Sequence, residues 1–188
     1  GASARVVRPA HDDLATVTAA IEEALASADV LLTIGGVSVG DHDVVKDALA
    51  RAGCTLDAWK VAIRPGKPIA IGRRGDALVL GLPGNPASAM VTFGLFGVPL
   101  LRAMRGVDPW RVRRRHARLV GDLPSPKGRR PFLRAHLDGD SVQCAPNQAS
   151  GATTATATSN ALVTLPADSP GARDGDRVEV VPFSEIGL

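Results

Sequence analysis

The stretch DVLLTIGGVSVGDHD, residues 29–43, decides the fold class of the first half of the chain. Its first six residues form an almost continuous apolar run, which is typical of a buried parallel strand. A glycine-rich loop follows over residues 35–40, and then Asp41 or Asp43 is placed to cap a helix that Gly53 ends. A strand, a glycine loop and a helix in this order predict an α/β domain.

The flanking segments continue the same pattern. Apolar residues at spacings of three and four predict a helix after the Asp12-Asp13 pair. Asn85 is placed to cap a further helix, and Pro86 suits its first turn. The expected elements are a strand over 3–8, a helix to about 28, strands near 58–63, 69–72 and 77–82, and a helix from 86 to about 105.

The character of the sequence changes after Gly106. No helical stripe is found from Val107 to Leu188, and short β-rich pieces alternate with turns. This spacing predicts a small all-β barrel or sandwich. The pieces are residues 113–120, 131–137, 141–145, 161–165 and 177–181. We therefore expect two domains, an α/β domain over 1–106 and a β domain over 107–188.

Composition excludes several classes of protein. With 45% apolar and 22% charged residues, the 188-residue chain is not disordered as a whole. Only 3% of the residues are aromatic and none is Tyr, which counts against base stacking on single-stranded nucleic acid. The net charge of +3 is too small to indicate nucleic acid by itself. The basic run over 111–118 is more often a solvated strand and linker than a nucleic-acid contact.

Location is also addressed by the sequence. No uninterrupted apolar run approaches the ~20 residues that span a membrane, and the first residues lack the apolar core of a signal peptide. Cys54 and Cys144 match no zinc or redox spacing, as expected for free thiols in a reducing compartment. We expect a cytoplasmic protein without membrane or nucleic-acid partners.

Three loops carry the candidate chemistry. The loop over 35–40 can present backbone N–H groups to a phosphate or another anion, although a tight turn that needs positive φ explains the glycines equally well. Its residues 36–40 also match the G-x-S-x-G pattern of serine hydrolases around Ser38, but no base is placed for that Ser. A hydrolase is therefore the remote alternative.

The second loop is a turn with cations, and the third opens a helix. Arg64 and Lys67 flank a rigid Pro65-Gly66 turn, which is either a hairpin with solvated charges or a clamp for oxyanions. The loop GLPGNPAS over residues 81–88 follows a strand, where ligands bind in α/β sheets.

Carboxylates stand near these loops. Asp12, Asp41 and Asp43 are expected to begin helices that pack on the sheet. Side chains of this kind are commonly N-caps, but one or two of them near a cationic loop could hold Mg²⁺ that bridges to phosphate oxygens.

Together, the stretches over residues 33–43, 59–68 and 81–89 resemble the molybdopterin molybdenumtransferases, the bacterial MoeA type and the E domain of gephyrin. The three motifs occur in the order and spacing of that family. Residues 150–152 and 159–166 resemble its late motifs more loosely. The resemblance implies a molybdopterin-binding three-layer α/β domain followed by the family's C-terminal β-barrel.

The resemblance also implies an activity, which is insertion of molybdate into adenylylated molybdopterin with release of AMP and a need for Mg²⁺. It implies a homodimer and a molybdopterin adenylyltransferase as a partner. Asp43 and Asp12 would serve catalysis and hold the metal. The substrate-binding residues would be Gly35, Gly36, Ser38, Gly40, Arg64, Gly66, Lys67, Pro83, Gly84, Asn85, Pro86 and Ser88.

One departure from the family pattern matters for the activity. The N-terminal region of the family is missing, as are the first strand and helix of its active domain with their Thr-Gly-Asp-Glu motif. The sequence therefore predicts a fragment, a truncated homologue or one piece of a split protein. A non-catalytic scaffold of the same fold is the alternative function.

Overall fold

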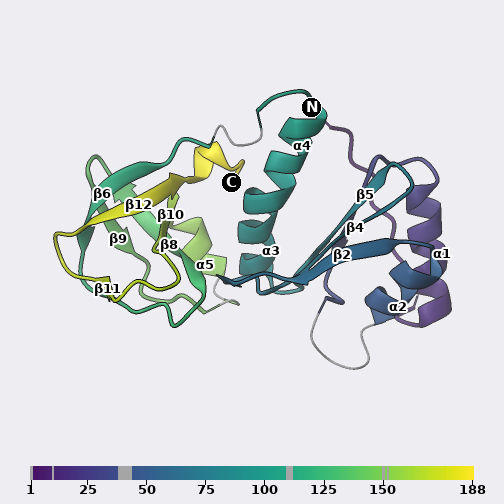
Figure 1. Ribbon diagram of the computed structural model, residues 1–188, viewed down its shortest axis with the longest axis horizontal. Helices are drawn as coiled ribbons and strands as arrows, with labels where there is room; N and C mark the ends of the chain where they lie inside the picture. The colour runs from purple at the N-terminus through teal and green to yellow at the C-terminus, as the bar shows by residue number, and fades with distance from the viewer. Residues whose placement is uncertain (1, 10, 38–43, 109–111, 150, 152) are drawn as a thin grey trace. The chain divides into compact units, whose positions relative to one another are not determined.

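The computed structural model describes residues 2–9, 11–37, 44–108, 112–149, 151 and 153–188 (Figure 1). The chain folds into two compact units. One, called here the α/β unit, comprises Gly1–Val61 and Pro68–Gly84. The other, called the barrel unit, comprises Ala62–Lys67 and Asn85–Leu188. The predicted boundary near residue 106 stays a prediction, and the helix that precedes it clusters with the barrel unit.

A four-stranded sheet forms the centre of the α/β unit, in the order β1-β5-β4-β2. Strands β1 and β5 are parallel, and the remaining pairs are antiparallel. The strands are β1 (Val30–Ile34), β2 (Thr55–Lys60), β4 (Pro68–Arg74) and β5 (Ala77–Leu82). The predicted strands of this half are thereby confirmed, apart from the first. The expected burial of the apolar run is wrong, however, because β1 is an edge strand that exposes Leu32 and Ile34.

Two helices cover the sheet of the α/β unit, α1 (Leu14–Leu25) and α2 (Val44–Arg51) (Figure 1). The apolar side of α1 buries Val17 and Ile21 in a cluster with Leu49 of α2 and Val79 of β5. The helix begins where Asp13 accepts hydrogen bonds from the backbone N–H and the hydroxyl of Thr16, at 2.9 and 2.7 Å. These bonds lower the pKa of Asp13.

The strand predicted over residues 3–8 is wrong. Residues 2–9 form no regular element, and Val6 is 76% exposed. A strand needs a neighbour to satisfy its backbone groups, and among the described residues none pairs with this segment. Arg5 is held instead by α1, through hydrogen bonds to the side chain and backbone of Glu23.

A closed five-stranded barrel dominates the barrel unit, as the sequence predicts. The order β10-β12-β6-β9-β8 closes because β8 also pairs with β10, and the short strand β3 (Ile63–Arg64) adds to β8. The core holds alternate residues of these strands, such as Ala117, Leu119, Val163 and Val180. The strands are β6 (Arg115–Val120), β8 (Arg130–Asp138), β9 (Ser141–Cys144), β10 (Ala161–Thr164) and β12 (Arg177–Pro182), with the small pair β7 (Leu123–Pro124) and β11 (Gly171–Ala172).

A continuous helix precedes the barrel. It consists of α3 (Pro86–Thr92), a π-helical turn over Phe93–Gly97 and α4 (Val98–Met104). Its 19 residues are long and apolar enough to cross a membrane by length and composition alone, a test that core helices of soluble proteins also pass. In the barrel unit the helix packs on the C-terminal segment, since Arg102 donates to the Glu185 carbonyl at 2.8 Å and Gly94 lies against Ile186.

Two short elements were not predicted. Helix α5 (Thr153–Ala157) lies in the Thr/Ala-rich stretch, and a 3₁₀ turn over Phe183–Glu185 follows β12. The basic run forms a solvated strand, as expected, because His116 and Arg118 of β6 are exposed while Ala117 and Leu119 are buried.

Candidate functional site

Two glycine loops meet in the α/β unit, at the carboxyl ends of the parallel strands β1 and β5. Gly35 follows β1 with φ of 86° and donates its N–H to the Leu82 carbonyl at 3.0 Å. A Cβ built at Gly84 would lie 3.2 Å from the Gly35 Cα. The two backbones are therefore as close as glycine permits. Gly36 also has positive φ, at 64°, so the expectation of a turn that needs positive φ is confirmed.

Val37 anchors the loop after β1 on the sheet. This side chain is 1% exposed and fills the place where a side chain at Gly81 would stand. A Cβ at Gly81 would lie 2.8 Å from Val37 Cγ1 and 2.9 Å from Ala70 Cβ. The glycine in β5 thus allows the loop after β1 to settle on the sheet, which fixes the backbone of Gly35.

The cationic turn belongs to the barrel unit and is held on two sides. On one side, Ile63 and Arg64 pair with β8 in parallel, and the Ala62 carbonyl accepts from the Arg130 N–H at 2.9 Å. On the other, Gly66 is buried against Thr92 of α3, so closely that a Cβ there would overlap the Thr92 Cγ2. Arg64 and Lys67 remain exposed on this fixed turn.

Helix α3 presents its first turn near the same place. Ser88 and Thr92 lie on one face of the helix because they are four residues apart, and the Thr92 hydroxyl donates to the Ser88 carbonyl at 2.8 Å. Gly66 therefore packs about one helical turn, ~5.4 Å, beyond Ser88. The N–H groups of Ala87 and Ser88 belong to the first turn, where the helix offers no backbone acceptor. The Ser88 side chain is itself buried, at 5% exposure.

Asn85 occupies the predicted N-cap position, and Pro86 stands in the first turn as expected. The predicted capping hydrogen bond is wrong, however, because the Asn85 side chain makes no such bond. Its Oδ1 is buried and has no hydrogen-bond partner among the described residues. A Cβ built at Gly151 would lie 3.9 Å from the Asn85 Nδ2.

Two arginines of β8 were missed by the sequence analysis. Arg130 lies opposite Ile63 in the β3–β8 pairing, so its side chain leaves the sheet on the other face from that of Arg64, and its guanidinium is held by Thr164 Oγ1 at 3.0 Å and Glu179 Oε1 at 2.7 Å. Arg134 is 1% exposed and donates to the Ala149 carbonyl at 3.0 Å, within the segment that leads to Gly151. Burial lowers the pKa of the Arg134 guanidinium. No motif in the sequence marks either arginine.

Of the predicted acidic residues Asp12, Asp41 and Asp43, the structure describes only Asp12. Asp12 is exposed and stands one residue before the N-cap of α1, which is Asp13. Asp43, Ser38 and Gly40 lie outside the described residues. Within the part that the structure describes, no group of three or more His, Cys, Asp or Glu side chains is placed to hold a metal ion.

These features define a two-part protein, in which a glycine-loop α/β domain precedes a closed β-barrel. Family models match both parts. Residues 1–103 match a probable molybdopterin binding domain, and residues 116–183 match the MoeA C-terminal region, domain IV. The chain belongs to the MoeA family of molybdopterin molybdenumtransferases, as the resemblance predicts.

Relatives agree along almost the whole chain. "Molybdopterin molybdenumtransferase 2" of Mycobacterium tuberculosis is 37% identical over 96% of this chain and 46% of its own length. The Haemophilus influenzae molybdopterin molybdenumtransferase is 34% identical over 93% of this chain and 45% of its own length. A structure of a molybdopterin biosynthesis MoeA protein from Pyrococcus horikoshii has a TM-score of 0.77 at 32% identity, and it covers 92% of this chain and 41% of that one. The chain thus spans about half the length of the curated relatives it matches.

Proposed function

We propose that the chain supplies the part of a molybdopterin molybdenumtransferase that binds molybdate and adenylylated molybdopterin. In the reaction we propose, molybdate is inserted into the pterin dithiolene and AMP is released. The observation that carries the proposal is the packing of Gly66 on α3. This contact fixes, against α3, the turn that carries two exposed cations, Arg64 and Lys67.

The charges suit an oxyanion. Molybdate is a tetrahedral dianion, and a single exposed ion pair contributes only ~0–1 kcal/mol. Binding therefore needs several donors whose directions are fixed in advance. The turn supplies Arg64 and Lys67, and the first turn of α3 supplies the N–H groups of Ala87 and Ser88.

The glycine loops suit the phosphate-bearing part of the substrate. Gly35 and Gly84 leave no side chain between a ligand and the backbone at the carboxyl ends of two parallel strands, which is where ligands bind in α/β sheets. We assign Gly36 and Pro83 to the same substrate-binding loops. Ser38, Gly40 and Asp43 are assigned to the site by the resemblance alone.

A Mg²⁺ ion held by Asp43 and Asp12 is part of the prediction from the family. Among the described residues Asp12 belongs to no group of three or more possible metal-binding side chains, so the fit of this site to a metal rests on the family and not on geometry. No step proposed here passes through the ion. A cytoplasmic location, a homodimer and an adenylyltransferase partner are likewise proposals.

The test is molybdate-dependent AMP release from adenylylated molybdopterin. It should be run on the chain alone and on a chimera that joins it to the remaining half of the Mycobacterium tuberculosis relative. We expect release by the chimera, and a loss of at least tenfold in its Arg64→Gln variant. Arg73→Gln, an exposed cation of β4, is the matched control. A folded chimera that binds the substrate without releasing AMP would favour the scaffold alternative.

A further inference from the structure

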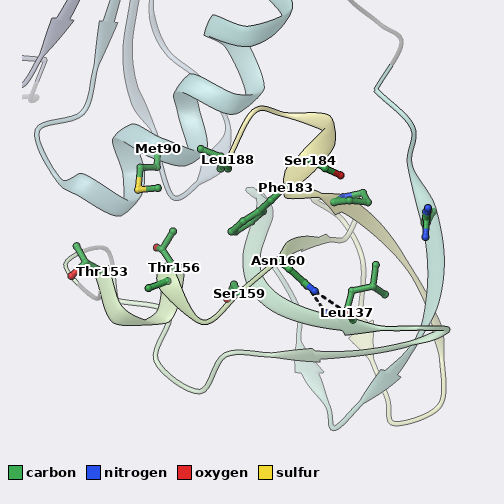
Figure 2. A pocket seen from close by; sticks show the side chains of 12 residues that line it. Met90, Leu137, Thr153, Thr156, Ser159, Asn160, Phe183, Ser184 and Leu188 are labelled. Atoms are coloured by element: carbon green, nitrogen blue, oxygen red, sulfur yellow. Dashed lines mark hydrogen bonds between the residues drawn. The ribbon is translucent and has the colours of Figure 1, made fainter.

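A cavity of about 750 Å³ lies at one end of the barrel, within the barrel unit (Figure 2). The strands contribute their end residues to it, Arg115 at the start of β6, Leu137 near the end of β8 and Pro182 at the end of β12. Helix α5, the segment after β12 and Met90 of α3 complete the wall. Barrel mouths are frequent ligand sites, and ligand pockets commonly measure ~300–1,000 Å³.

Most of the wall is apolar. Figure 2 shows Phe183 between Met90 and Asn160, with Thr156 of α5 beside it. Several polar groups of the wall are already engaged within the protein. Asn160 uses both ends of its amide on the Leu137 backbone, at 2.7 and 2.9 Å, and the Ser159 hydroxyl donates to the Ala155 carbonyl at 2.6 Å. These hydrogen bonds fix the orientation of both side chains in the wall.

Arg115 is the exception. Along β6, Ala117 and Leu119 face the core, and Arg115 shares their register at the open end of the strand. Arg114, on the opposite face, pairs with Glu179 at 2.9 Å. The Arg115 side chain makes no hydrogen bond or ion pair with any residue that the structure describes, and the lining includes no acidic side chain from that part of the chain. The Arg115 guanidinium is thus left without an ion-pair partner at the rim of an apolar cavity.

We propose that this cavity binds a small amphipathic carboxylate. Its aromatic or branched aliphatic body would lie against Phe183 and Met90, and its carboxylate would pair with Arg115. One guanidinium matches one planar carboxylate through two parallel hydrogen bonds. A phosphate dianion would need more donors than the rim offers. The site is separate from the cationic turn and does not depend on the proposed transferase function.

The chain carries its own reporter for this site. It has two methionines, Met90 in the wall and Met104 outside it. With [¹³C-methyl]methionine labelling, 4-phenylbutyrate is titrated into the full chain and both methyl resonances are followed by NMR. We expect a saturable shift of the Met90 methyl and none of Met104. The neutral 4-phenylbutanamide, which has the same body, should bind about fivefold more weakly, the factor that an ion pair of this exposure supplies.

Two variants test the assignment. Arg115→Gln should weaken 4-phenylbutyrate about fivefold without changing the thermal midpoint, whereas Arg118→Gln, which faces outward from the same strand, should leave it unchanged. Ala157→Trp, on the exposed side of α5, should fill the cavity and abolish the Met90 shift. No shift of Met90 at millimolar 4-phenylbutyrate would overturn the site. Equal affinity for the acid and the amide, or shifts of both methionines, would overturn the carboxylate pairing at this cavity.

Discussion

The α/β unit and the barrel unit each carry candidate ligand-binding features, and the two units build these features in different ways. In the α/β unit the site is backbone, since Gly35 and Gly84 meet where two parallel strands end. In the barrel unit it is side-chain charge, carried by Arg64 and Lys67 on a turn that β8 and α3 hold in place. A glycine loop cannot be changed without changing its shape. A charge on an anchored turn can be removed while the fold remains.

The largest expected effect comes from the anchor of the turn. Gly66→Ala should lower the free energy of unfolding by about 3 kcal/mol or more, because the residue has φ of 99° and the new Cβ overlaps Thr92. Gly175→Ala is the matched control. That residue has φ of 84° in the same unit with nothing within 4 Å of the new Cβ, so only backbone strain of about 1 kcal/mol is expected. Equal losses in urea unfolding would show that Thr92 does not hold the turn.

A somewhat smaller loss is expected in the α/β unit. Gly81→Ala places a methyl group 2.8 Å from Val37 Cγ1 and should cost about 2 kcal/mol by overpacking. The double variant Gly81→Ala with Val37→Ala should lose less than the sum of the two single changes, since removing one side chain makes room for the other. Strict additivity would mean that Val37 does not anchor the glycine loop on β5.

The two cysteines, one in each unit, predict how the stability of the protein depends on pH. Burial raises the pKa of the Cys144 thiol in β9 to about 11, from an ordinary value of 9.0. The folded state therefore keeps a proton that the unfolded chain releases above pH 9, and stability should fall as the pH rises from 9 to 11. We expect a loss of about 1–2 kcal/mol that is specific to this thiol.

The measurement is urea unfolding of the wild type and of Cys144→Ala between pH 8 and 11. The advantage of the wild type over the variant should shrink across that range. Cys54 of the α/β unit, whose pKa burial also raises, is tested in the same way with Cys54→Ala. A difference between wild type and Cys144→Ala that does not change with pH would contradict the burial of this thiol.

Much of this architecture could be predicted because it depends on local sequence. The alternation in β6 determines which of its residues are buried, and the Pro86 start of α3 follows from turn chemistry. The apolar run before Gly35 predicts a strand but not its burial, because β1 lies at the edge of the sheet and exposes Leu32 and Ile34. The segment over 3–8 was misjudged because its strand character depends on a neighbour that periodicity cannot supply. Asn85 was misjudged for a similar reason. An N-cap residue type predicts a helix start, but its hydrogen bond depends on where the side chain turns.

The candidate site shows the same division. The cationic turn and the glycine loops were found as motifs, since their residue types are unusual together. Arg130 and Arg134 could not be found in this way, because they stand in an ordinary β pattern and only the pairing of β3 with β8 and the packing inside the barrel give them a place. The barrel-end cavity has no motif at all, since its wall is drawn from the ends of three strands, from α3 and α5, and from the segments before β10 and after β12.

Arg64→Gln and Lys67→Gln should have the smallest effects on stability. Both side chains are exposed and make no ion pair among the described residues, so each change should cost less than about 0.5 kcal/mol. Urea unfolding of each variant against the wild type measures this. A loss above 1 kcal/mol would mean that the cations serve the fold instead of a ligand.

The most direct test of an oxyanion site on the Arg64–Lys67 turn is the binding of molybdate itself. Equilibrium dialysis of radiolabelled molybdate should be compared for the wild-type chain, for Arg64→Gln with Lys67→Gln, and for the control Arg73→Gln. We expect the wild type and the control to bind molybdate saturably. The double variant should bind it at least tenfold more weakly, with its unfolding curve unchanged. Equal affinity in all three folded proteins would contradict the assignment of the oxyanion site to this turn.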